Sequence, residues 1–176
     1  MKGSKYITLT SIFIALSIVL SRILSIRVSI GGVEGIRIGF GDFPLMLSGI
    51  LFGPFWGGLA GISADIIGYI ISPMGPYMPH FTLTSALKGI IPGLLFLWLF
   101  RENKNFLYLF LTFLITKIIV SFLIVIFIHV LFNLPYLTLI PPRLIALLIE
   151  VPIYTILSLT LLKRFGVEFS LDKLNL

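Results

Sequence analysis

Cysteine is absent from this chain of 176 residues, and charged side chains are scarce, at 11% of the sequence. The lack of cysteine excludes a disulfide framework, a thiolate metal site and a cysteine nucleophile. Soluble domains carry about 25% charged residues, whereas this chain is 58% hydrophobic and has a mean hydropathy of +1.13. The composition therefore indicates an integral membrane protein.

The sequence also lacks the short motifs on which common enzymes depend. It contains no G-x-x-x-x-G-K-[ST] phosphate loop, no H-E-x-x-H zinc helix and no G-x-S-x-G nucleophile elbow. The two histidines, His80 and His129, have no second ligand at metal spacing, so we expect ordinary core or interfacial side chains. We predict that the chain is not an enzyme and does not hydrolyse ATP itself, and we expect no catalytic residue, cofactor or metal.

Long apolar runs, interrupted mainly by glycine and proline, are typical of transmembrane helices rather than of the short alternating strands of a barrel. The sequence predicts an all-α membrane protein with about six transmembrane helices in one domain, residues 1–176: 6–26, 40–52, 55–71, 82–100, 106–131 and 142–162. The second is short. Lys2 and Lys5 before the first run resemble a signal peptide, but no small-x-small cleavage site follows, so we expect a retained helix.

The basic residues predict an orientation in the membrane. The net charge of +6 is scattered and many basic residues flank apolar segments, so topology explains it better than nucleic-acid binding does. If the N-terminus is cytoplasmic, that side receives Lys2, Lys5, Arg101, Lys104, Lys163, Arg164 and Lys173, and the other receives Arg27, Arg37 and Arg143. The positive-inside rule therefore favours N-in and C-in, with loops 27–39, 72–81 and 133–141 together outside.

Small residues recur at the spacing at which helices approach closely. Gly49, Gly53, Gly57 and Gly61 form consecutive small-xxx-small steps, and Ser11 and Ala15 form another on the first helix. Packing within the bundle and docking of a partner membrane protein both remain possible interpretations.

Charged residues interrupt three helices at one depth. Asp65, Lys88 and Glu150 each lie about 10 Å below the outer end of their helix. Arg143, Glu150 and Tyr154 share one face of the last helix, and His80, Thr84 and Lys88 share a face of another. These faces predict a polar pocket that opens outward, beside which Tyr77 and Phe81 could stack on a ligand. Alternatively, Asp65, Lys88, Glu150 and the deeper Lys117, the least favoured site candidate, form two ion pairs that only fix helix packing.

Residues Gly35 to Gly93, "GIRIGFGDFPLMLSGILFGPFWGGLAGISADIIGYIISPMGPYMPHFTLTSALKGIIPG", and the "LIPPRLI" that opens the last helix resemble a known family. The family is the substrate-binding S components of energy-coupling factor vitamin transporters, and the resemblance is closest to its folate-specific group. It implies a six-helix protein of a prokaryotic cell membrane, surrounded by membrane lipid, that captures a vitamin from outside. It also implies partners: a transmembrane coupling subunit, which small residues of the first helix contact (here Ser11 and Ala15), and two cytoplasmic ATPase subunits.

The residues are compatible with folate chemistry. One carboxylate, Asp65 or Glu150, could accept the two parallel N–H donors of a pterin, and Arg27, Arg37 and Arg143 could bind the glutamate tail. Two alternatives remain. The chain could be an S component for riboflavin, pantothenate, thiamine or a precursor, or it could be a lipid-binding membrane enzyme or regulatory subunit.

Overall fold

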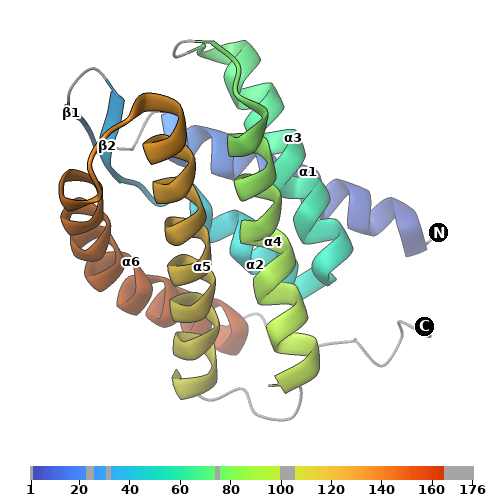
Figure 1. Cartoon of the computed structure of the whole chain (residues 1–176). Coiled ribbons are helices and arrows are strands. Elements are labelled where there is room, and N and C mark those ends of the chain that lie inside the picture. The colour runs from blue at the N-terminus through green and yellow to red at the C-terminus, as the bar shows by residue number, and fades with distance from the viewer. Residues whose placement is uncertain (1, 23–25, 31–32, 74–75, 100–105, 165–176) are drawn as a thin grey trace.

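A computed structural model of the chain describes residues 2–22, 26–30, 33–73, 76–99 and 106–164 (Figure 1). These residues form six helices and one pair of strands: α1 (Lys2–Arg22), β1 (Ile26–Ile30), β2 (Val33–Ile38), α2 (Asp42–Phe52), α3 (Pro54–Ile71), α4 (Pro79–Leu99), α5 (Phe106–Phe132) and α6 (Tyr136–Arg164). The predicted helical membrane fold is confirmed. The predicted start of the last helix at Pro142 was wrong, because α6 begins at Tyr136 and contains Pro141 and Pro142 in its interior.

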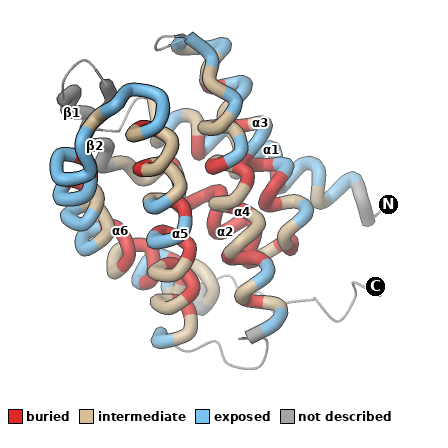
Figure 2. The backbone as a smooth tube through the Cα atoms, in the orientation of Figure 1, coloured by how far each residue is buried: buried red, intermediate tan, exposed pale blue. Residues whose placement is uncertain are grey.

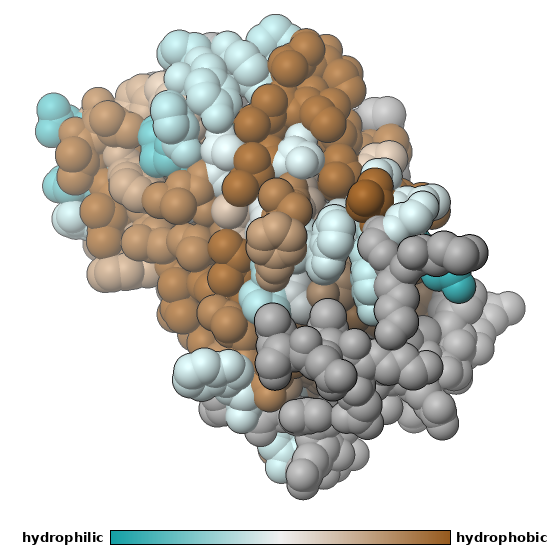
Figure 3. All heavy atoms as spheres, turned by 90° about the vertical axis from the view of Figure 1, so that its right-hand side faces the viewer, coloured by the Kyte–Doolittle hydropathy of each residue, from teal (hydrophilic) through white to brown (hydrophobic). Residues whose placement is uncertain are grey.

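Five of the six helices are long and apolar enough to cross a membrane, and α2, with 11 residues, is the short one that the sequence predicted. Large apolar side chains on several helices point outward, among them Ile70, Trp98 and Leu148. Figure 3 shows broad apolar areas on one face of the molecule, with more hydrophilic side chains gathered toward its upper end. Such a surface suits contact with lipid, and the chain is a multi-pass membrane protein.

The segment predicted as the loop 27–39 contains an antiparallel hairpin instead. Ile26 pairs with Ile38 and Arg27 with Arg37, and the register shifts between Val28 and Ser29. Isoleucine and valine recur in both strands, and β-branched residues favour an extended backbone.

The helix ends agree with the predicted topology. In Figure 1 the C-terminal end of α3 and the N-terminal end of α4 lie at the top, near the hairpin and the junction of α5 with α6. The C-terminal end of α4 and the N-terminal end of α5 lie at the bottom. The three segments predicted to lie outside the membrane are thus at one end of the bundle.

The glycines of α2 and α3 pack inside the bundle. A Cβ atom added to Gly49 would lie 2.0 Å from the carbonyl oxygen of Gly89 on α4, and one added to Gly57 would lie 2.6 Å from the Cα of Gly49. A Cβ on Gly61 would lie 2.1 Å from the carbonyl oxygen of Ser85. Since real Cβ atoms do not approach so closely, three helices can meet only because these positions carry no side chain. Packing within the bundle is therefore the correct interpretation for Gly49, Gly57 and Gly61, whereas Gly53 forms the turn between α2 and α3 with a φ of +90°.

A core of large side chains lies between α2, α4, α5 and α6, where Figure 2 shows the helices facing one another through buried residues. Met46, Phe96, Phe113 and Tyr154 are its most buried large members. The Tyr154 ring contacts the rings of Phe43 and Phe113, so the position of its hydroxyl group is fixed by packing.

Candidate functional site

Charged side chains from four helices meet beside this core. Lys88 Nζ of α4 donates a hydrogen bond of 2.7 Å to Asp42 Oδ1 of α2, and Lys117 Nζ of α5 donates one of 2.7 Å to Asp42 Oδ2. Lys117 also forms an ion pair with Glu150 of α6. The side chains are 25% exposed for Asp42, 14% for Lys88, 9% for Lys117 and 4% for Glu150. Two cations and two anions therefore balance one another in a largely water-excluded place.

Asp42 is placed by the local structure at the start of α2. It occupies the first turn of the helix, where the N-terminal backbone dipoles favour an acidic side chain. The preceding Gly41 accepts a hydrogen bond of 2.7 Å from Ser17 Oγ of α1. A Cβ atom on Gly41 would lie 2.4 Å from the Cβ of Ser21, so the glycine allows α1 to pack against this turn. Contacts with α1 thus fix the backbone that carries the carboxylate.

Asp42 was missed by the sequence analysis, which considered two ion pairs among Asp65, Lys88, Lys117 and Glu150 without assigning partners. In the structure Lys88 pairs with Asp42, and Lys117 pairs with both Asp42 and Glu150. Lys117, ranked lowest from its depth, lies at the centre of the cluster. An acid at the start of the short second helix, in an otherwise apolar segment, was the signal that could have identified Asp42.

Glu150 and Tyr154 lie on one face of α6, as predicted, and both hold the segment that follows the hairpin. The backbone N–H of Gly39 donates a hydrogen bond of 3.1 Å to Glu150 Oε1, and the Tyr154 hydroxyl donates one of 2.9 Å to the Gly39 carbonyl oxygen. Arg143 is partly buried two turns nearer the N-terminal end of the helix. The backbones of Arg27 and Arg37 are paired in the hairpin, but their side chains lie outside the described part of the structure.

Asp65 and Tyr77, two further predicted residues, are connected through Thr82. Thr82 Oγ1 donates a hydrogen bond of 2.7 Å to Asp65 Oδ2, and Tyr77 Oη lies 2.6 Å from the same hydroxyl. Tyr77 is 43% exposed and its ring contacts that of Tyr69. A partly exposed aromatic ring and a partly exposed carboxylate thus lie together at the end of the bundle that carries the hairpin.

Phe81 and the two histidines have packing roles in the structure. The rings of Phe81 and Phe127 contact that of His80, which links α4 to α5. His129 Nδ1 lies 2.8 Å from the carbonyl oxygen of Leu134, and its ring stacks on Tyr136. Within the described ranges, no group of three or more histidines and acids lies close enough together to hold a metal ion.

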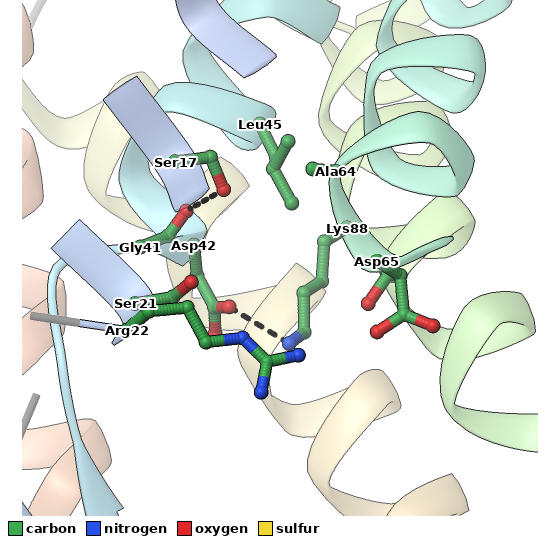
Figure 4. A pocket seen from close by; sticks show the side chains of 10 residues that line it. Ser17, Ser21, Arg22, Gly41, Asp42, Leu45, Ala64, Asp65 and Lys88 are labelled. Atoms are coloured by element: carbon green, nitrogen blue, oxygen red, sulfur yellow. Dashed lines mark hydrogen bonds and ion pairs between the residues drawn. The ribbon is translucent and has the colours of Figure 1, made fainter. Parts of the chain in front are cut away.

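A polar cavity of about 40 Å³ adjoins the charged cluster (Figure 4). Its lining comes from α1 to α4 and the turn before α2: Ser17, Ser21, Arg22, Gly41, Asp42, Leu45, Ala64, Asp65, Ser85 and Lys88. The predicted site residues Asp65 and Lys88 therefore do share one cavity. Its volume suits a few water molecules, since one needs at least about 10–15 Å³, whereas ligand pockets hold about 300–1,000 Å³. This cavity is a polar recess beside the charged cluster and is too small to be a whole ligand site.

Ser11 and Ala15, the predicted docking residues, are both exposed on α1. The Ser11 hydroxyl is bonded within its own helix, to the carbonyl oxygen of Ile7, at 2.9 Å. Ile14 and Ile18, which neighbour these two residues at helical spacing, pack against Leu45 of α2 and Ala60 and Ala64 of α3. Ser11 and Ala15 border this packed side of α1, but the described part of the chain leaves both exposed.

Comparison with known proteins connects this arrangement to a transporter family. The family model described as "ECF-type riboflavin transporter, S component" matches residues 2–165. A folate transporter FolT from Clostridium novyi is 40% identical over 96 residues, which are 54% of this chain and 53% of the relative. The alignment thus spans about half the length of that curated relative.

Two solved structures share the fold over almost the whole chain. The crystal structure of FolT bound with folic acid superposes with a TM-score of 0.77 and 27% identity, covering 93% of this chain and 97% of that one. The structure of the S component of a bacterial ECF transporter gives a TM-score of 0.68 and 18% identity, covering 93% and 96%. At 18% identity the second match shows the fold alone.

Proposed function

Since the chain belongs to the family of ECF-type riboflavin transporter S components, we propose that it is the S component that binds folate for uptake into the cell. One observation supports the proposal most strongly: both comparisons lead to folate. A relative named as a folate transporter is similar in sequence, and a structure bound with folic acid has the same fold. The shared cavity of Asp65 and Lys88 supports a polar recognition site at the same end of the bundle as the hairpin.

The two candidate carboxylates differ in how free they are to bind a ligand. Glu150 is buried and already accepts from the Gly39 N–H and from Lys117. Asp65 is partly exposed and accepts from a neutral hydroxyl, that of Thr82. An ionised carboxylate offers about four acceptor positions, so Asp65 can still receive two parallel N–H donors. We therefore assign the pterin ring to Asp65, which also places the ring beside Tyr77.

The other predicted ligand contacts are part of this proposal. Tyr77 and Phe81 would contribute aromatic surface, and Lys88 would contribute a cation at the inner wall. Arg27, Arg37 and Arg143 would bind the glutamate tail, because guanidinium groups match carboxylates in a bidentate geometry.

Energy for uptake would come from partner subunits, namely a transmembrane coupling subunit and two cytoplasmic ATPases. The uncovered face of Ser11 and Ala15 supports docking of the coupling subunit, because small side chains let two helix backbones approach closely. The distribution of basic residues supports an N-in and C-in orientation in the cytoplasmic membrane of a prokaryotic cell. The chain itself would act as a binding protein and not as an enzyme.

Riboflavin is the second candidate ligand, because the matching family model carries its name. Purification of the chain, identification of any co-purified compound by absorbance and mass, and titration with folic acid and riboflavin separate the two. We expect saturable binding of folic acid and much weaker binding of riboflavin. The reverse order, or a site filled only by lipid, would contradict the proposal.

A further inference from the structure

Lys88 has two carboxylates at the cavity that it lines, and it bonds to one of them. Asp42 and Asp65 both border the recess. The lysine ammonium donates to Asp42 at 2.7 Å, whereas Asp65 accepts from the Thr82 hydroxyl. Figure 4 shows the Lys88 side chain directed at Asp42, with Asp65 on the other side of the lysine. The choice between these two partners determines whether Lys88 neutralises Asp65.

Several contacts hold Asp42 in the position from which it binds Lys88. Each of its carboxylate oxygens accepts from one lysine, Lys88 or Lys117, and charge-assisted bonds of this kind are stronger than neutral ones. Its backbone follows Gly41, which is bonded to Ser17 and packed against Ser21. The carboxylate is therefore fixed from α1, α4 and α5 before any ligand binds.

Without the Asp42 charge, Lys88 would be a mostly buried cation that lacks its anion. Leaving one member of a buried pair without its partner is costly, so the ammonium would move to another carboxylate within reach. Apart from Asp42, Asp65 is the carboxylate that borders the same recess as Lys88, so we expect the ammonium to move to Asp65. A carboxylate that is paired with lysine has fewer free acceptor positions and a weaker attraction for the N–H donors of a ligand.

We propose that Asp42 is a positioning residue, which keeps Lys88 away from Asp65 so that the Asp65 carboxylate stays available to the paired N–H donors of the ligand's heterocycle. This inference rests on the proposed function, and it gives Asp42 a role that acts through Lys88, without contact with the ligand. It also explains why Asp65 accepts a hydrogen bond from the neutral hydroxyl of Thr82 and not from Lys88.

The first test measures how much the pterin ring adds to binding. Folic acid and p-aminobenzoylglutamate, which is the same molecule without the pterin, are titrated calorimetrically against the purified full chain in detergent. The ratio of the two affinities is the pterin gain. We expect Asp42→Asn and Asp65→Asn each to lower this gain about ten- to a hundred-fold, with little change for the tail fragment. In the double variant the two losses should not add, since both act on one carboxylate.

A matched pair of double variants separates positioning from charge balance. Asp42→Asn with Lys88→Met and Asp42→Asn with Lys117→Met have the same net charge. The first removes the lysine that would move to Asp65, so we expect the pterin gain to rise from that of Asp42→Asn to that of Lys88→Met alone, which lacks only the cation that Lys88 would contribute to the site. The second leaves Lys88 without Asp42, so we expect the gain to stay low. Thermal unfolding of each variant shows whether it is folded, and the pterin gain of Asp65→Asn tests the inference even if a variant of Asp42 does not fold.

A parent chain that does not bind folic acid removes the proposed function and this inference with it. If the parent binds folic acid, two results overturn the inference while the proposed function stands. One is that Asp65→Asn keeps the pterin gain, and the other is that the losses from Asp42→Asn and Asp65→Asn add fully. Equal behaviour of the two double variants overturns it as well, because the effect would then be one of charge alone.

Discussion

The hydroxyl of Tyr154 donates a hydrogen bond of 2.9 Å to the carbonyl oxygen of Gly39, although 115 positions separate the two residues in the chain. The N–H of the same glycine is bonded to Glu150, one turn earlier in α6. Both backbone polar groups of Gly39 are thus satisfied by the last helix, as buried backbone groups require. The hairpin is in this way attached to α6 directly after its second strand.

Tyr154→Phe should loosen that attachment without disturbing the core. The ring contacts with Phe43 and Phe113 remain, but the Gly39 carbonyl oxygen loses its donor. We expect a loss of about 1 kcal/mol in stability, measured by thermal unfolding, and lower hydrogen-exchange protection in β1 and β2. Tyr77→Phe serves as the control, because its hydroxyl is exposed and lies far from the hairpin in sequence. Unchanged protection of the hairpin would show that this bond does not hold it.

Lys117→Met should be among the most destabilising single changes in the polar cluster. It leaves the buried Glu150 without its cation and removes one of the two lysines from Asp42. The expected cost is about 3–5 kcal/mol, seen as a large fall in unfolding temperature. Adding Glu150→Gln should recover a good part of this loss. If the double variant is no more stable than Lys117→Met, the two residues are not energetically coupled.

Two neighbouring glycines of α3 give a matched test of helix packing. In Gly57→Ala the new methyl group would lie 2.6 Å from the Gly49 Cα and the Gly89 carbonyl oxygen, which are backbone atoms that cannot yield. In Gly58→Ala it meets the side chain of Ile90, which can move. We expect Gly57→Ala to lower the yield of folded protein and its unfolding temperature much more than Gly58→Ala does. Similar effects of both would contradict the close helix contact.

Ala15→Trp should block transport while the purified chain still binds its ligand. Ala15 is exposed on α1, and an indole ring there would separate backbones that must approach closely. Leu16→Trp is the control, since it is exposed on the same helix but is turned about 100° away from Ala15. Uptake in cells and folic acid binding in detergent are measured together. Loss of both in Ala15→Trp would indicate a folding defect and not a docking surface.

Arg143→Ala tests where the glutamate tail lies. If the guanidinium binds a tail carboxylate, the substitution should weaken folic acid by about ten-fold or more and leave a bare pterin nearly unaffected. Calorimetry with the two compounds measures the difference. Equal weakening of both compounds would place Arg143 near the ring or in a structural role.

The sequence alone determined the six helices and the short second helix, and it identified the glycines as positions where another helix can approach closely. These follow from local composition, because lipid admits only long apolar helices and because a missing side chain permits close approach wherever the partner lies. It also identified Asp65, Lys88 and Glu150 as charges that require an explanation, since a charge in an apolar chain is costly in any arrangement.

Only the tertiary structure decided which charge meets which. Whether Lys88 binds Asp42 or Asp65 depends on how α2, α3 and α4 are rotated and how deeply each lies, and hydropathy does not specify either quantity. The same holds for Lys117, whose depth made it the least favoured site candidate, although α2 brings Asp42 beside it. The attachment of the hairpin likewise depends on α6, which satisfies the backbone of Gly39 through Glu150 and Tyr154, more than 100 positions later in the chain. Contacts between distant helices fix these partners, so no local pattern could have predicted them.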